Sequence, residues 1–149
     1  MKELPPIEKP LGSLGFSSSL AMPLLEMDAA VGLPRGFLVR LLDEDDWSFV
    51  VKIHAVLEAA VSQLLGEALG DPRLRHALEY LPMGESKTGK LALAASLDLI
   101  STQEKKFIKT VSELRNRLAH GIRDIGFTFE AELKHQDKNQ KKIFADTCS

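Results

Sequence analysis

The chain has 149 residues, 44% of them hydrophobic and 27% charged, which is the size and composition of one ordinary globular domain. Its formal net charge is −2, so any nucleic-acid site has to be a local basic patch. The single cysteine, Cys148, excludes an intrachain disulfide and a cysteine-based metal site. No apolar run approaches the ~18 residues of a membrane span, and no apolar signal core follows the N-terminus. We therefore expect a cytoplasmic protein that does not associate with membranes.

The first 33 residues are punctuated by helix breakers and by flexible glycine and serine residues. This composition predicts an irregular N-terminal arm over residues 1–33, which is either loosely held or packed on a partner subunit. The prolines concerned are Pro5, Pro6, Pro10 and Pro23.

From residue 34 onward, apolar residues recur at helical spacing, which predicts a helical domain over residues 34–122. The fold class is therefore all-α: a compact helical bundle with an irregular N-terminal arm and a polar C-terminal tail. Five helices are expected. The first begins near Pro34, the next three run from about Trp47 to Leu69, from Arg73 to Leu81 and from Lys90 to Leu99, and the last begins after a cap at Ser101.

The last long helix has clear boundary signals. Ser101 and Glu104 have the spacing of a capping box, and Gly121 is expected to end the helix in the left-handed conformation. An apolar stripe is expected to face the core; it consists of Phe107, Val111, Leu114 and Leu118.

Residues 123–149 form an expected C-terminal extension. Residues 125–129 alternate like a short extended segment, and residues 130–144 are polar and lysine-rich. Its lysines either touch phosphates or form a solvated face interleaved with acidic residues. They are Lys134, Lys138, Lys141 and Lys142.

The run from Arg115 to His120 is the most informative feature of the sequence. Asn116 and His120 lie four residues apart, on a helix face nearly opposite the expected core stripe, with Arg115 to one side of that stripe. One interpretation is structural, since basic groups in a last turn stabilise the negative end of a helix. The other is chemical. Metal-free RNA cleavage needs a group that moves protons, which histidine does near neutral pH, and a cation for the charge on phosphorus. A neutral amide can orient the phosphate or the imidazole.

A second candidate pair lies on the long helix after Trp47. His54 and Glu58 are four residues apart on its apolar stripe, where an unpaired carboxylate would be costly. Glu58 is therefore expected to pair with an arginine of the last helix, Arg115 or Arg117. The alternative is that His54 and Glu58 lie at the edge of the stripe and reach water.

These features together resemble the HEPN superfamily of compact helical domains, whose signature is an arginine, a polar residue and then a histidine that closes the final core helix. The matching residues are Arg115, Asn116 and His120, and the resemblance covers about residues 46–121. Within the superfamily the chain is most like the mannitol operon repressor family, which shares the pattern Lys90-Leu91 to Ile100, then Leu114-Arg115-Asn116 and Ala119-His120.

The resemblance implies a homodimer with a composite site at its two-fold axis. It implies RNA binding and metal-independent endoribonuclease activity of the toxin or defence type. Arg115 would stabilise the phosphate, Asn116 would orient the phosphate or the imidazole, and His120 would be the general acid or base. Supporting roles would fall to Glu58, His54 and Arg117. The alternative is a non-enzymatic transcriptional regulator that acts through protein contacts. An antitoxin or a regulatory protein is an expected partner, and no cofactor or metal is expected.

One segment imitates a phosphate-binding loop. Residues 84–90 have the glycine and lysine spacing of such a loop, but Leu91 stands where a magnesium-binding Ser or Thr belongs. We expect a simple loop here, with Ser86 or Thr88 as a helix cap.

Overall fold

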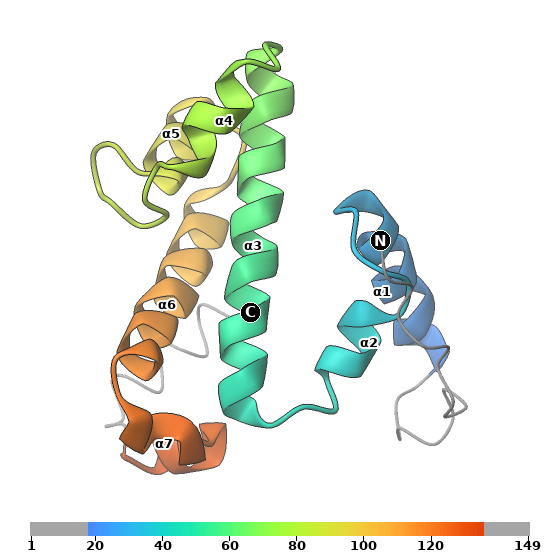
Figure 1. The fold of residues 1–149 in the computed structure, drawn as a ribbon, viewed down its shortest axis with the longest axis vertical. Coiled ribbons are helices and arrows are strands. Elements are labelled where there is room, and N and C mark those ends of the chain that lie inside the picture. Colours follow the sequence, from blue (N-terminus) through green and yellow to red (C-terminus); the bar gives the residue numbers. More distant parts are fainter. Residues whose placement is uncertain (1–17, 136–149) are drawn as a thin grey trace. The chain divides into compact units, whose positions relative to one another are not determined.

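The structure, a computed structural model, describes residues 18–135. The expectations for residues 1–17, for Cys148 and for the lysines beyond Lys134 lie outside these residues. All regular secondary structure within residues 18–135 is helical, which confirms the all-α fold class (Figure 1). The chain divides into two compact units, residues 1–45 and residues 46–149.

The first unit contains a helix that the sequence analysis did not predict. Helix α1 spans Ser18–Ala30, so the expectation of irregular chain is wrong for these residues. Pro23 lies inside α1 and removes one backbone hydrogen bond. The loss is tolerated because the residues around it, such as Leu24 and Met27, are good helix formers.

A buried carboxylate connects α1 to α2, which spans Phe37–Leu41. The Asp28 side chain is fully buried and accepts hydrogen bonds from the backbone N–H groups of Gly36, at 2.6 Å, and Leu38, at 3.0 Å. Gly36 has a φ of 79°, a conformation that favours glycine, and directly precedes α2. Asp28 thus satisfies the otherwise unpaired donors at the start of α2.

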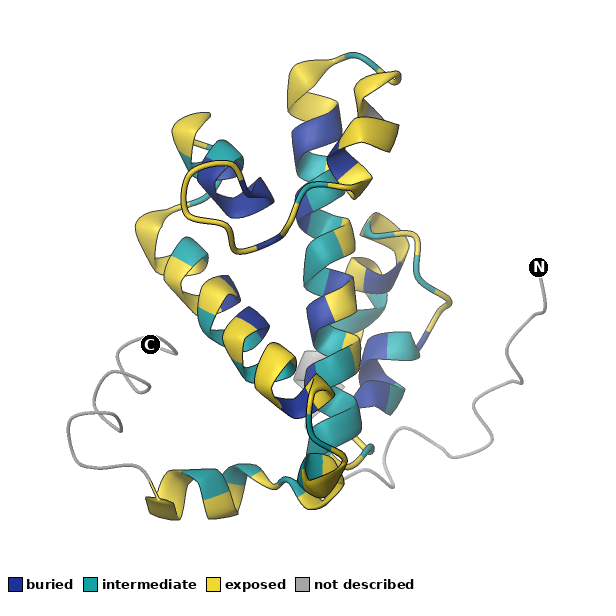
Figure 2. Cartoon of the chain, turned by 60° about the vertical axis from the view of Figure 1, so that its left-hand side comes forward, coloured by how far each residue is buried: buried dark blue, intermediate teal, exposed yellow. Residues whose placement is uncertain are grey.

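The second unit is built around one long helix. Helix α3 spans Asp46–Leu69 and packs against α4 (Leu74–Glu79), α5 (Lys90–Ser96) and α6 (Thr102–Ala119). Figure 2 shows buried positions on α3, α5 and α6. The core cluster consists of Val61, Leu65, Leu78, Met83, Leu91, Ala94 and Ile108.

By length and composition alone α3 could also cross a membrane, since its mean hydropathy over an 18-residue window is 1.4. It packs on three other helices of the second unit, and 33% of that window is buried.

The loop before α5 is folded back onto that helix. The backbone N–H groups of Lys90 and Leu91 donate to the carbonyls of Pro82 and Met83, at 2.9 and 3.2 Å. The cap residue is Gly89, with no side-chain hydrogen bond, so the expected cap by Ser86 or Thr88 is wrong. A Cβ on Gly89 would lie 2.6 Å from the backbone oxygen of Glu85, which explains the glycine. The loop therefore holds Pro82 and Met83 in fixed positions beside α5.

The capping box at the start of α6 is confirmed. The Ser101 side chain accepts from the Glu104 N–H at 3.1 Å, and the Glu104 carboxylate accepts from the Ser101 N–H at 2.7 Å. The helix ends where expected, with His120 as the C-cap and Gly121 directly after it, but the expected left-handed conformation is wrong, because Gly121 has a φ of −128°, which is extended.

The buried face of α6 is rotated from the predicted stripe. Ile108, Ser112 and Leu118 are buried, whereas Phe107 is 38% exposed. This face also brings Arg115 inward to a half-buried position, because it follows Ser112 by three residues. Of the predicted stripe, Leu118 is buried and Val111 and Leu114 are half-buried, so the prediction was right in part; it missed Ser112 because that residue counted as polar.

The extended segment expected over residues 125–129 is absent, whereas a helix was one of the two interpretations of residues 130–144 and is observed up to residue 135. A 3-10 helix, η2, spans Ile122–Gly126, and α7 spans Phe129–His135. The Phe129 N–H donates to the Asp46 carboxylate at 2.8 Å, and its ring meets that of Phe49 edge-on at 6.2 Å. These contacts attach α7 to the first turn of α3.

Candidate functional site

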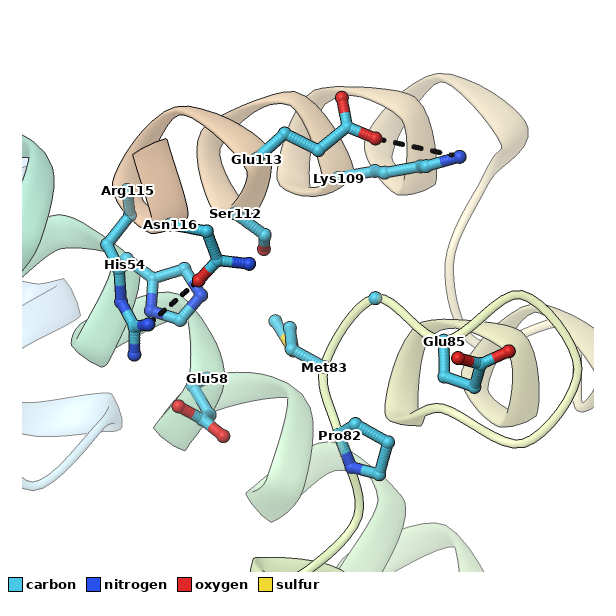
Figure 3. A pocket seen from close by; sticks show the side chains of 11 residues that line it. His54, Glu58, Pro82, Met83, Glu85, Lys109, Ser112, Glu113, Arg115 and Asn116 are labelled. Atoms are coloured by element: carbon cyan, nitrogen blue, oxygen red, sulfur yellow. Dashed lines mark hydrogen bonds and ion pairs between the residues drawn. The ribbon is translucent and has the colours of Figure 1, made fainter. Parts of the chain in front are cut away.

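A pocket of about 430 Å³ opens between α3, the loop before α5 and α6 (Figure 3). It brings together four of the six predicted site residues: His54, Glu58, Arg115 and Asn116. Its other lining residues are Pro82, Met83, Gly84, Glu85, Lys109, Ser112 and Glu113.

Arg115 carries a positive charge that no carboxylate balances among residues 18–135. Its Nη1 donates to Oδ1 of Asn116 at 2.8 Å, a bond that orients the amide but adds no negative charge. The basic residues nearby all have acidic partners: Lys90 with Glu58 at 3.1 Å, Lys109 with Glu113 at 3.8 Å and Arg117 with Glu132 at 2.9 Å. Arg115 is therefore the basic group of the pocket that is available to an anion.

His54 is a buried imidazole in the wall of this pocket. It is only 4% exposed, and neither ring nitrogen hydrogen-bonds to any of the described residues. Burial lowers the pKa of His54, the positive charge of Arg115 lowers it further, and Glu58 acts in the opposite direction. The ring is thus held neutral near pH 7, with one donor and one acceptor free.

Glu58 does pair with a basic residue, but with Lys90 of α5 and not with an arginine of the last helix. The Lys90 ammonium is 2% exposed and lies 3.1 Å from Glu58 Oε1. The expected pairing with Arg115 or Arg117 is therefore wrong. The predicted pairing failed because the loop before α5 turns Lys90 inward. The position of Lys90 next to a predicted loop did not reveal this.

His120 does not line the pocket. It is exposed at the C-terminal cap of α6. Two large apolar side chains follow it on η2, Ile122 at 85% exposure and Ile125 at 58%. Within one chain, the predicted triad is thus divided between the pocket and an apolar surface at the end of α6.

Sequence reasoning missed several pocket residues. Met83 and Ser112 line the pocket and were not singled out, and Lys90, the ion-pair partner of Glu58 behind the pocket, was noted as a helix start, in a loop-like run and in the family resemblance but not as a buried cation. A signal for Lys90 was available, since it begins an otherwise alanine- and leucine-rich helix. Met83 could not be found, because its place depends on how the loop folds.

No group of three or more His, Cys, Asp or Glu side chains that could hold a metal ion is found within residues 18–135. The chain matches no protein-family model, no curated protein and no solved structure.

Proposed function

We propose that this chain binds RNA through Arg115 and Asn116 and cleaves it without a metal ion, as a homodimer in the cytoplasm. The observation that supports the proposal most is the unbalanced charge of Arg115 at a pocket mouth, with the Asn116 amide beside it. A guanidinium and an amide are the donors that suit a phosphodiester.

The proposed reaction is an internal transfer at phosphorus. A base removes the proton from the ribose 2′-hydroxyl, the 2′-oxygen bonds to phosphorus, and the bond to the 5′-oxygen breaks. An acid protonates that leaving oxygen, which leaves a 2′,3′-cyclic phosphate and a 5′-hydroxyl. Exposed His120 is the imidazole that would move these protons, and Arg115 would stabilise the added charge on the phosphoryl oxygens.

The dimer is part of the proposal because a single chain divides the triad. Exposed Ile122 and Ile125 lie directly after His120 and would lose contact with water in a two-fold interface. Such an interface at the end of α6 would bring two copies of His120 together.

The test is cleavage of labelled single-stranded RNA in excess EDTA, with a DNA copy as control. We expect cyclic phosphate products, and a rate loss of about 10²–10⁴ in His120→Ala. His76→Ala is the matched control, because His76 is also an exposed helical histidine. A wild-type protein that cuts neither structured nor unstructured RNA, or a fully active His120→Ala, would refute the catalytic proposal.

A second candidate function is a non-enzymatic regulator. The exposed pair Ile122 and Ile125 favours it as well, since an apolar surface can bind a regulatory protein in place of a second copy. Loss of partner binding in Ile122→Asp, together with an inactive wild-type protein, would favour this function over cleavage.

A further inference from the structure

The wall of the pocket contains an unusual pair of groups. His54 and Glu58 lie one turn apart on α3, so their side chains project from the same face of the helix. His54 is nine-tenths buried, yet no hydrogen bond to its ring nitrogens is found within residues 18–135. Among the described residues only Nη2 of Arg40 is an enclosed polar side-chain atom without a partner, so the ring nitrogens of His54 are open to the pocket, where a bound molecule can hydrogen-bond to them.

The charges around the pocket restrict what that molecule can be. Glu58 is balanced by Lys90 through Oε1 only, which leaves Oε2 as a free acceptor. Arg115 is not balanced by any carboxylate of the described residues and is joined to Asn116. The ligand must therefore offer an anionic group to Arg115 and hydrogen-bond donors to Glu58.

The rest of the wall combines charged and apolar side chains, and Pro82 and Met83 supply an apolar surface that a base ring can contact. Figure 3 shows Pro82 and Met83 on the loop that faces α6 across the pocket. A volume of about 430 Å³ is that of a small-molecule site and exceeds what a single anion fills. An aromatic base attached to a phosphate meets all of these conditions.

Among the four RNA bases, one has the matching edge. The Watson–Crick edge of guanine carries an acceptor, O6, followed by two donors, N1–H and N2–H₂. A neutral His54 supplies a donor for O6, and the free Oε2 of Glu58, which can accept two hydrogen bonds, faces the N1–H and N2–H donors. Adenine, cytosine and uracil each place an acceptor where a carboxylate would meet a donor.

We infer that this pocket binds a guanine nucleotide, with the base edge on His54 and Glu58 and its phosphate on Arg115. The inference rests on the proposed function: if an RNA phosphate binds to Arg115, the neighbouring base would be a guanine held by His54 and Glu58. RNA cleavage would then occur beside guanine in preference to the other bases.

The test is calorimetric titration of the full chain with nucleoside 5′-monophosphates, which requires no catalysis. We expect guanosine monophosphate to bind about tenfold or more tightly than the adenosine, cytidine and uridine compounds. Inosine monophosphate, which lacks the N2 amino group, is expected to lie between them. Equal affinity for all five compounds, or no binding, would overturn the inference.

Two variants test whether Glu58 and His54 cause the preference for guanosine monophosphate. Glu58→Gln should lose most of the guanine preference, whereas Glu113→Gln, which also lines the pocket, should keep it. His54→Leu provides a second variant if Glu58→Gln does not fold, and it should also lose the preference. Preference retained in the folded variants would overturn the inference.

The outcomes separate the two proposals. RNA that is bound or cut without base preference would overturn the inference alone. Guanosine monophosphate bound selectively by a protein that has no affinity for RNA would support the pocket and refute the proposed function.

Discussion

The Glu58–Lys90 pair should respond asymmetrically to the removal of either partner. Lys90 is 2% exposed and Glu58 is 34% exposed, at a separation of 3.1 Å. Glu58→Ala leaves a buried ammonium without a counter-charge, whereas Lys90→Met leaves a carboxylate that still reaches water and fills the space with an apolar chain. Removing one partner of a fully buried pair costs about 3–5 kcal/mol. Because Glu58 is one-third hydrated, we expect about 1–3 kcal/mol for Glu58→Ala.

The assay is urea unfolding at pH 7, followed by circular dichroism, with Lys90→Met expected to cost less than Glu58→Ala. Glu130→Ala is the control, since its pair with Lys134 is exposed on both sides and should contribute nothing measurable. An unchanged midpoint in Glu58→Ala, or a larger loss in Lys90→Met, would refute the reasoning from burial.

Three further predictions follow from other parts of the second unit. Because the pKa of His54 is lowered, stability should be complete above about pH 6.5 and fall below it as the unfolded chain takes up a proton. His54→Leu should flatten this dependence in thermal unfolding between pH 7 and 5, and an unchanged slope would contradict it. Ile122→Asp should convert a dimer of about twice 16.4 kDa to a monomer in light scattering, and a wild-type monomer at high concentration would contradict the composite site. Ser101→Ala should destabilise the second unit by about 1 kcal/mol in urea unfolding, and no change would show that the capping box is not needed.

The helices of the second unit could be predicted because their signals are local. The long helix expected from about Trp47 to Leu69 is observed over Asp46–Leu69, and the capping box at Ser101 is present. Residues 125–129 were mispredicted because their alternating pattern is too short to separate an extended chain from a 3-10 turn.

The candidate site could be predicted only in part, since its residues come from distant segments. The spacing of His54 and Glu58 placed them on one face, and the structure places both in the pocket. The partner of Glu58 depends on how the loop before α5 folds back, which no local pattern in the sequence encodes. The inward turn of Arg115 followed from the burial of Ser112, a residue that hydrophobic periodicity passes over.

The central claim is that the charge of Arg115 is available to RNA. Its most direct test compares two neighbouring arginines by fluorescence anisotropy with a labelled single-stranded RNA at fixed salt. Arg115 has no acidic partner among the described residues, whereas Arg117 lies 2.9 Å from Glu132. We predict that Arg115→Ala weakens binding about tenfold or more, the loss of one charge-assisted contact, while Arg117→Ala changes it little. Equal effects of the two substitutions, or no RNA affinity in the wild-type protein, would contradict the account.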